Sequence, residues 1–183
     1  MREGDLSSAP SLINSVVEIL NQGESLLIEI SDSAFTRKLP AAFNASVGAH
    51  YRHCLDHFQN LYAAAEAGDL NYDHRQRDTL IETDRFAALN ATRLLRENFQ
   101  RLDAGRVERS LNVTCKTSYS LNGSQVSAST VGREIMYVVA HAVHHYALIG
   151  VMAALMDLKM PDGFGVAPST VKHQTDSARS GAH

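Results

Sequence analysis

Two stretches of the chain decide its fold: SVGAHYRHCLDH at residues 46–57 and HAVHHY at residues 141–146. Each carries three histidines among apolar neighbours. At about 100° per residue in an α-helix, His50, His53 and His57 fall within an arc of about 60°. His141 and His145 stand one helical turn apart on one face. Both stretches are therefore predicted to be helices that present imidazoles along one side.

A shared metal ion accounts for these histidines better than separate roles do. A single helical histidine is more often a core or surface residue than a ligand, but burying many imidazoles without partners is costly. A catalytic zinc usually has three protein ligands and an open position for water. One histidine of the first stretch and two of the second would supply three. Imidazole ligands favour a divalent transition metal, zinc or nickel first and then iron or manganese, over calcium or magnesium.

Length and composition limit the function classes. The 183 residues suffice for one domain with a substantial core. The formal net charge is −3, and no cluster of basic residues alternates with aromatic ones, so we expect no nucleic-acid partner. The N-terminus has no apolar leader, and three histidines interrupt the longest apolar run, residues 135–158, so we expect no membrane span. Two cysteines without CxxC spacing fit a reducing cytosol, and we expect a cytoplasmic protein.

Hydrophobic periodicity predicts four long helices. They cover residues 11–30, a segment from Asn44 or Ser46 to residue 67, a segment from Thr83 or Asp84 to residue 104, and residues 131–158. Gly68 and Gly105 are expected to end the second and third helices. The polar segment 69–78 is expected to be a loop. Alternating residues at 109–119 and 125–130, joined through Asn122-Gly123, predict a β-hairpin.

The expected architecture is an all-α four-helix bundle with a small β-hairpin before the last helix, an arrangement that commonly builds metal sites from facing helices. Residues 1–173 are expected to form this single domain. Residues 174–183 are expected to be a disordered tail. The two histidine helices should face each other.

The histidine stretches and the order of the helices resemble the DinB-like (DinB/YfiT) superfamily, over about residues 10–160. The resemblance implies a four-helix bundle in which one histidine of the second helix and an HxxxH pair of the last helix hold a divalent metal. The HxxxH pair is similar to His141 and His145. The lone histidine is similar to His53, seven residues after Ser46-Val47. This chain adds His50 and His57 on the same face, and His144 beside His145, as alternative ligands.

Other polar residues are candidates for roles around the ion. Ligating imidazoles normally donate their second nitrogen to a carboxylate, a carbonyl or water, and Asp56 and Glu134 are candidates for that partner. For Glu134, the sequence favours a solvated glutamate near the start of a helix. The loop residues Tyr72 and Arg75 are candidates to contact substrate, Arg75 as a guanidinium for an anion. Glu82 or Asp73 could act as a general base, although a solvated loop is the preferred reading of this segment.

The leading functional hypothesis is a metal-dependent enzyme of the transferase or hydrolase type that acts on a small molecule. A bound ion can lower the pKa of water or hold a thiol as its thiolate. The resemblance adds transfer of a low-molecular-weight thiol as one such reaction. The alternatives are a non-catalytic metal-binding or stress-response bundle and a metal-free histidine cluster that responds to pH. The apolar stripes and the resemblance both predict a homodimer.

Overall fold

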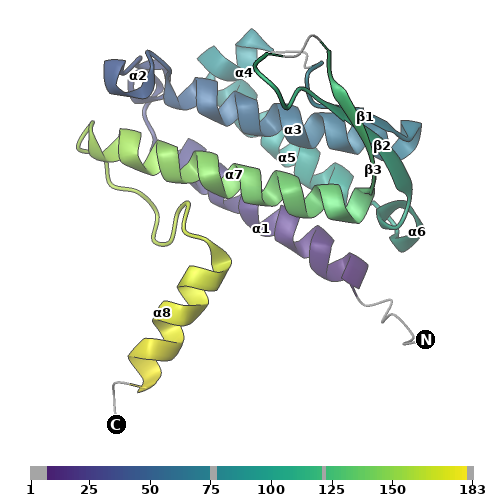
Figure 1. The fold of residues 1–183 in the computed structure, drawn as a ribbon. Helices are drawn as coiled ribbons and strands as arrows, with labels where there is room; N and C mark the ends of the chain where they lie inside the picture. The colour runs from purple at the N-terminus through teal and green to yellow at the C-terminus, as the bar shows by residue number, and fades with distance from the viewer. Residues whose placement is uncertain (1–7, 75–77, 121–122, 181–183) are drawn as a thin grey trace.

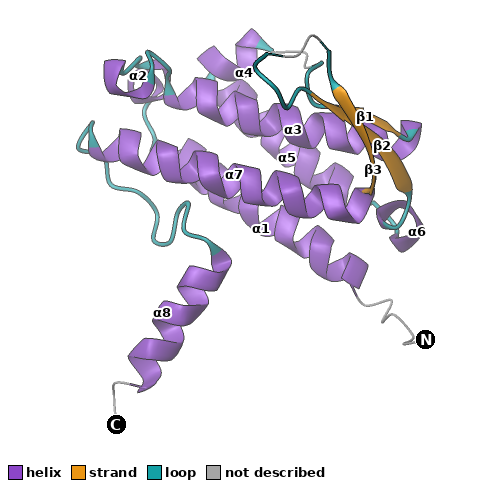
Figure 2. Ribbon diagram, in the orientation of Figure 1, coloured by secondary structure: helices purple, strands orange, loops and turns teal. Residues whose placement is uncertain are grey.

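The structure, a computed structural model, describes residues 8–74, 78–120 and 123–180. It is mainly helical, with a small sheet at one end of the helices (Figures 1 and 2). The longer helices are α1 (Ser8–Glu29), α3 (Val47–Ala67), α5 (Arg85–Gln100), α7 (Val131–Ala154) and α8 (Pro168–Ser180). The shorter helical elements are α2 (Asp32–Thr36), η1 (Pro40–Ala42), α4 (Thr79–Thr83) and α6 (Ala104–Val107). The strands are β1 (Asp69–Asn71), β2 (Ser110–Cys115) and β3 (Gln125–Thr130).

Four long helices pack around one core. Helix α1 packs against α5 and α7, and α3 packs against the same two helices from the other side. The histidine helices α3 and α7 therefore lie side by side, as the sequence predicted (Figure 1). By length and composition α7 would also pass as a membrane span, a test that core helices of globular proteins pass too. Here α7 packs against α1 and α3.

Local signals place the start and end of α3, the first histidine helix. The Ser46 hydroxyl accepts a hydrogen bond from the backbone N–H of Ala49 at 3.0 Å, which satisfies a donor of the first turn. Gly68 ends the helix with φ of 90°, in the left-handed region that glycine adopts without strain. Both boundaries confirm the sequence prediction and fix the register of the histidines.

Two tyrosines fill the core beneath the histidine helices. The rings of Tyr51 and Tyr146 stack with centroids 6.0 Å apart, and both side chains are fully buried. The Tyr51 hydroxyl and the Thr92 hydroxyl of α5 lie within hydrogen-bond distance, 2.8 Å. A Cβ atom at Gly23 of α1 would come within 2.3 Å of both tyrosine hydroxyls. Gly23 thus lets α1 approach the tyrosine pair closely.

The sheet is larger than predicted. Strands β2 and β3 pair antiparallel from Ser110 opposite Thr130 to Cys115 opposite Gln125, which confirms the hairpin; Asn122 of the expected turn lies outside the described residues. Strand β1 pairs parallel with β2 inside the segment that was expected to be a loop. The reason is Leu70, which is 1% exposed and pairs with Val113. Tyr72 of the same segment is buried as well, so two core side chains order this stretch among its polar neighbours.

Several helix ends differ from the prediction. Helix α5 ends at Gln100 instead of residue 104, because Asp103 caps a separate helix, α6, by accepting from the N–H of Arg106 at 2.8 Å. Gly105 lies inside α6 and does not end α5. Helix α7 ends at Ala154 instead of residue 158, and Asp157 follows with φ of 56°. Residues 174–180, expected in a disordered tail, belong to α8.

Candidate metal centre

Three histidines of α3 and α7 form a group that could hold a metal ion. They are His53, His141 and His145, all partly buried, and their nearest ring nitrogens lie within 4.8 Å of one another. The Nε2 atoms of His53 and His141 are 3.0 Å apart. The ring centroids of His145 lie 4.6 Å from those of His53 and His141. The structure therefore brings together the three residues that the sequence and the DinB-like resemblance pointed to.

The spacing of these nitrogens suits a transition-metal ion. Zinc–nitrogen bonds of about 2.0–2.1 Å place two ligand nitrogens of a tetrahedral ion about 3.3 Å apart. The 3.0 Å between the Nε2 atoms of His53 and His141 is close to that separation. The ligand nitrogen of His145 lies within 4.8 Å of the other two. The donors are neutral-ring nitrogens, which zinc, nickel, copper and iron accept readily.

The alternative ligands occupy different places around the trio. His57 is buried, and its Nδ1–H donates to the backbone carbonyl of His53 at 2.9 Å, with its ring 4.3 Å from that of His141. His50 lies at the other end, with its Nδ1 3.0 Å from the Nδ1 of His145. His144 is exposed. Five imidazoles thus form one continuous row between α3 and α7, which we call the histidine seam: His50, His53, His57, His141 and His145.

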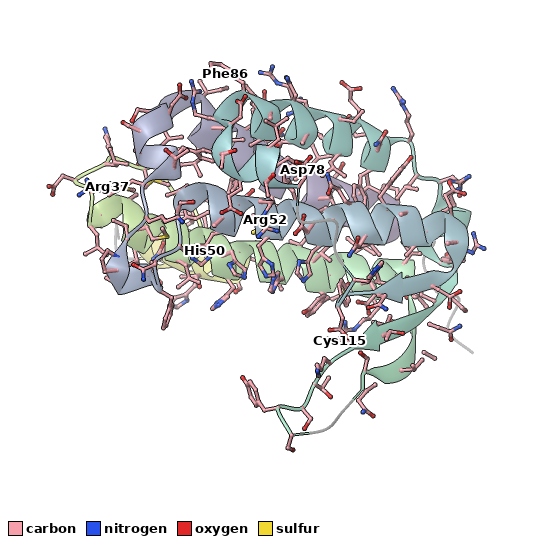
Figure 3. The ribbon with its side chains drawn as sticks, turned by 90° about the horizontal axis from the view of Figure 1, so that it is seen from above. Arg37, His50, Arg52, Asp78, Phe86 and Cys115 are labelled. Carbon is pink, nitrogen blue, oxygen red and sulfur yellow. The ribbon has the colours of Figure 1, made fainter. Side chains whose placement is uncertain are left out.

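The surroundings of His50 favour its neutral form. Burial lowers the pKa of His50, and the positive charge of nearby His144 lowers it further. The Nδ1 of a neutral His50 can form a hydrogen bond with the Nδ1 of His145, which would leave the Nε2 of His145 for the ion shared with His53 and His141. Figure 3 shows His50 and Arg52 on α3, seen from above.

Two tyrosines cover one end of the histidine seam. The Tyr72 ring stacks on His57 with centroids 5.2 Å apart and an interplanar angle of 26°. The Tyr137 ring stacks on His141 at 5.8 Å and 20°. The two tyrosine rings lie 5.1 Å from each other. They form a wall, the tyrosine wall, that holds the imidazoles of His57 and His141 on this side. Tyr137 was missed by the sequence reasoning, although its position four residues before His141 places it on the same helix face.

Glu134 accepts a hydrogen bond from Tyr72 of this wall, and its environment differs from the prediction. It was expected to be a solvated residue, but it is only 3% exposed. Tyr72 donates to its Oε2 at 2.7 Å, and Ser129 and Arg133 donate to its Oε1 at 2.6 and 3.0 Å. The folding of β3 over the start of α7 buries the carboxylate, which no local sequence signal announces. Burial, followed by the bond to Glu134, raises the pKa of Tyr72 well above its usual value.

Asp56 and Glu82 share a cation. Arg52 donates from Nη1 to the buried Asp56 at 2.6 Å and from Nε to Glu82 at 3.0 Å. This network joins α3 to α4. Glu82, one of the two candidate general bases, therefore sits in an ion pair with Arg52.

The segment that leads into α4 is anchored differently from the prediction. Asp73, the other candidate base, is exposed and accepts hydrogen bonds from the N–H of Lys116 and the hydroxyl of Ser124. It thereby ties the segment after β1 to the residues between β2 and β3. Tyr72 is buried, so the solvated-loop reading is wrong for this residue. Arg75 lies outside the described residues.

A cavity of about 350 Å³ adjoins the other side of the tyrosine wall. Its lining comes from β2, β3, the first turns of α7 and the segments just after β1 and β2: Tyr72, Val113, Cys115, Thr117, Ser127, Ala128, Ser129, Arg133, Glu134 and Tyr137. Figure 3 labels Cys115 at the end of β2. The Arg133 guanidinium carbon lies 5.7 Å from the centre of the Tyr137 ring, and this side chain is 63% exposed. Among the described residues Arg133 supplies a guanidinium to the cavity lining, whereas Arg75, predicted to contact substrate, lies outside the described residues.

Comparison with known proteins gives a match to part of the chain. The chain matches no protein-family model. It is 33% identical over 104 residues to a protein named FK506-binding protein 5 from Rhizopus delemar. The match covers 57% of this chain and 27% of that protein, so the chain spans about a quarter of the length of its curated relative.

Proposed function

We propose that the chain is a DinB-like, metal-dependent enzyme of the cytosol that acts on a small molecule, using His53, His141 and His145 as ligands in a four-helix bundle. The observation that carries this proposal is the convergence of three imidazoles from two helices far apart in the sequence. The order of the four long helices and the HxxxH pair in α7 support the DinB-like assignment.

The neighbourhood of the trio supports an enzyme over a purely structural site. The three histidines are only partly buried, so an ion that they hold would be open to a small molecule, and a cavity that could admit part of that molecule lies beyond the tyrosine wall. A bound divalent ion would supply Lewis acidity, lowering the pKa of water or of a thiol towards neutrality. Tyr72 and Tyr137 would orient the imidazoles, and Arg133 would attract an anionic group of the substrate to the cavity.

Thiol transfer is the reaction class we favour, with hydrolysis second. A ring-nitrogen site leaves room for a soft sulfur donor, and zinc and nickel both accept thiolate readily. The cavity walls are mixed, with hydroxyls and a thiol beside two aromatic rings. Such a lining fits a small polar thiol better than a long apolar chain.

Metal analysis of the untagged protein tests the site. We expect one zinc or nickel ion per chain in the wild type, and a loss of affinity of at least tenfold in each of His53→Ala, His141→Ala and His145→Ala. His144→Ala is the matched control, because it removes an exposed imidazole next to a proposed ligand. Wild-type protein that takes up no zinc, nickel, iron or manganese would overturn the proposal.

Cobalt substitution separates the enzyme from the non-catalytic alternative. In the cobalt-loaded protein, a low-molecular-weight thiol should change the visible absorption spectrum if a coordination position is open. A closed four-histidine site that includes His57 would show no change, and would favour a metal-binding bundle without catalysis. Metal-loaded wild type and His141→Ala would then be compared in thiol-transfer and ester-hydrolysis assays, where activity in the wild type alone is expected.

A further inference from the structure

Strand β3 forms one edge of the small sheet. The strand order is β1–β2–β3, so β2 pairs with β3 on one side only. The residues of β3 are exposed except Ser129, which is half-buried, and Val126 is 68% exposed. Edge strands are usually short, charged, interrupted by proline or covered, because a free edge pairs readily with another chain. No residue of β3 is charged or a proline. The strand therefore lacks the protection that its position calls for.

The pairing of β2 with β1 shows how the backbone of the sheet alternates. A strand residue directs its N–H and C=O groups to one side, and the next residue directs them to the other. The N–H of Asn112 donates to the carbonyl of Gly68, and the carbonyl of Thr114 accepts from the N–H of Tyr72, each at 3.0 Å. Asn112 and Thr114 therefore bond towards β1. Val113, which lies between them, bonds towards β3.

The same alternation identifies the outward backbone groups of β3. Val113 pairs with Ser127, so the N–H and C=O groups of Ser127 bond to β2. Val126 and Ala128, on either side of Ser127, direct theirs away from the sheet. Apart from the Ser127 hydroxyl, 3.4 Å from the Ala128 carbonyl oxygen, no group in the described part of the chain is hydrogen-bonded to these outward atoms. The outward N–H and C=O groups are thus available to a further strand.

The cavity of about 350 Å³ adjoins this edge. Its lining includes Ser127, Ala128 and Ser129 of β3, together with Tyr137 and Arg133 of α7. Side chains of neighbouring strands that lie opposite one another point to the same face of a sheet. A strand added beside β3 would therefore direct every second side chain to the face on which the cavity lies.

Arg133 selects the charge of such a side chain. Its Nη1 donates to Glu134 at 3.0 Å, but a guanidinium has five N–H donors, and this side chain is 63% exposed. The Glu134 carboxylate is buried and also accepts from Tyr72 and Ser129. Strand β3 carries no acidic group of its own. A carboxylate on an added strand would thus meet a cation that can bind it through two donors.

We propose that the β3 edge binds an extended, acidic peptide segment of a partner protein, which adds to the sheet antiparallel to β3 and places a carboxylate side chain in the cavity against Arg133. Antiparallel pairing is the more stable per residue, and in such complexes the main chain supplies affinity while the pocket supplies specificity. The acidic residue lies opposite Ser127 or Ser129, with its own N–H directed away from β3. Its two neighbours bond to the outward groups of β3. This inference goes beyond the proposed function and requires no metal.

Fluorescence anisotropy with synthetic peptides tests the pairing in metal-free protein. The probe is fluorescein-labelled Thr-Thr-Val-Glu-Val-Thr-Thr, whose glutamate should face the cavity. Methylation of both valine nitrogens removes the donors to β3 and should weaken binding at least tenfold, whereas methylation of the glutamate nitrogen should leave it within about threefold. Glutamine in place of the glutamate should weaken binding about tenfold. The opposite methylation pattern, or no saturable binding below about 1 mM, would overturn the proposal.

Variants of the protein locate the site. Ala128→Pro removes an outward N–H but leaves the ladder to β2, since edge strands tolerate proline at such positions, and it should abolish binding. Ala128→Ser is the matched control, because it keeps the N–H and should bind the probe as the wild type does. Arg133→Gln should bind the glutamate and glutamine probes equally. Unchanged binding in Ala128→Pro would overturn the proposal, and the methylated probes decide it in wild-type protein if this variant does not fold.

Sedimentation equilibrium distinguishes a partner peptide from a second copy of the chain. The proposal expects that Ala128→Pro and the wild type have the same mass in solution. A wild-type dimer that Ala128→Pro converts to monomer would show that β3 pairs with its own copy, and would overturn the assignment of the edge to a partner peptide.

Discussion

The helix pair α3–α7 has two faces that differ in burial, although each is built from residues next to those of the other in the sequence. Tyr51 follows His50 in the sequence, and Tyr146 follows His145. The tyrosines turn inward and are fully buried, whereas the trio His53, His141 and His145 is only partly buried. A rotation of about 100° per residue is all that separates the two environments. The same two helices therefore supply both the core and the candidate metal centre.

The difference shows how each face is suited to one task. Burial raises the pKa values of Tyr51 and Tyr146, so both remain neutral and serve packing. The histidine seam concentrates five titratable rings where an ion can reach them, at the cost of apolar contacts between α3 and α7. We expect the buried tyrosines to govern the stability of the fold and the histidine seam to govern its response to metal.

Truncating the buried face should give the largest effect. Tyr146→Ala removes a fully buried ring that stacks on Tyr51 and on Phe164, the latter at 4.8 Å. A large aromatic-to-alanine change in a core costs about 3–5 kcal/mol of unfolding free energy. Urea denaturation of metal-free protein measures it. His141→Ala, on the other face, should cost on the order of 1 kcal/mol under the same conditions. Equal losses would remove the distinction between the faces.

The same contrast explains what the sequence could predict. The periodicity of α3 and α7 and the caps at Ser46 and Gly68 are local signals, so the helices and the facing histidine clusters were accessible from the residues alone. The choice of His53 over His50 and His57 came from the DinB-like resemblance. The tyrosine wall depends on where β1 and β3 pack on α7, which is set by distant partners. Glu134 was misjudged for this reason, because its position near a helix start indicated solvent while the sheet covers it.

Metal that binds to the histidine seam should raise the unfolding free energy of the wild type. An ion present at about 100 times its dissociation constant adds about 2.7 kcal/mol to the unfolding free energy. We expect this gain in thermal or urea unfolding with zinc or nickel, and its loss in His141→Ala and after chelation. Tyr146→Phe should keep the gain, since it leaves the imidazoles in place. The gain should also shrink below about pH 6.5, where free imidazole binds protons that compete with metal.

A gain that persists in His141→Ala would place the ion elsewhere. A gain that Tyr146→Phe also loses would mean that the two faces are not independent. The first result would remove the metal-binding role from the histidine seam, and the second would replace the division between a stabilising face and a metal-binding face with a single coupled core.

Tyr72 stacks on His57 of the histidine seam and donates a hydrogen bond to the buried carboxylate of Glu134. Two substitutions can separate these interactions. Tyr72→Phe keeps the ring that stacks on His57 but removes the hydrogen bond to Glu134, which should cost about 1–3 kcal/mol because the carboxylate is buried. Metal affinity should change little. Tyr72→Ala removes the ring as well and should also weaken metal binding. If Tyr72→Phe weakens metal binding as much as Tyr72→Ala does, then the hydrogen bond to Glu134 supports metal affinity and the stacking on His57 does not.

The smallest effect is expected at Glu24 of α1, beside Gly23 on the tyrosine face. Arg93 donates to its Oε1 at 2.7 Å, and Arg96 donates to its Oε2. Burial alone would raise the pKa of Glu24, but the hydrogen bonds and charges of these arginines outweigh it and lower the pKa. Glu24→Gln should therefore cost up to about 1 kcal/mol at pH 7, as partly exposed ion pairs do.

The pH dependence of this loss follows from the sign of the shift. A carboxyl group with a lowered pKa in the folded state stabilises the protein above its ordinary value of about 4.3, and this contribution disappears as the pH falls through the lowered pKa. The gap between wild type and Glu24→Gln in urea unfolding should thus narrow from pH 7 to acid pH, with or without metal. Glu97→Gln, at an exposed position 3.8 Å from Arg101, should leave the unfolding free energy within about 0.5 kcal/mol of wild type. A gap that changes with metal would show that this ion pair communicates with the histidine seam, and that the two faces of the helix pair are coupled through α1.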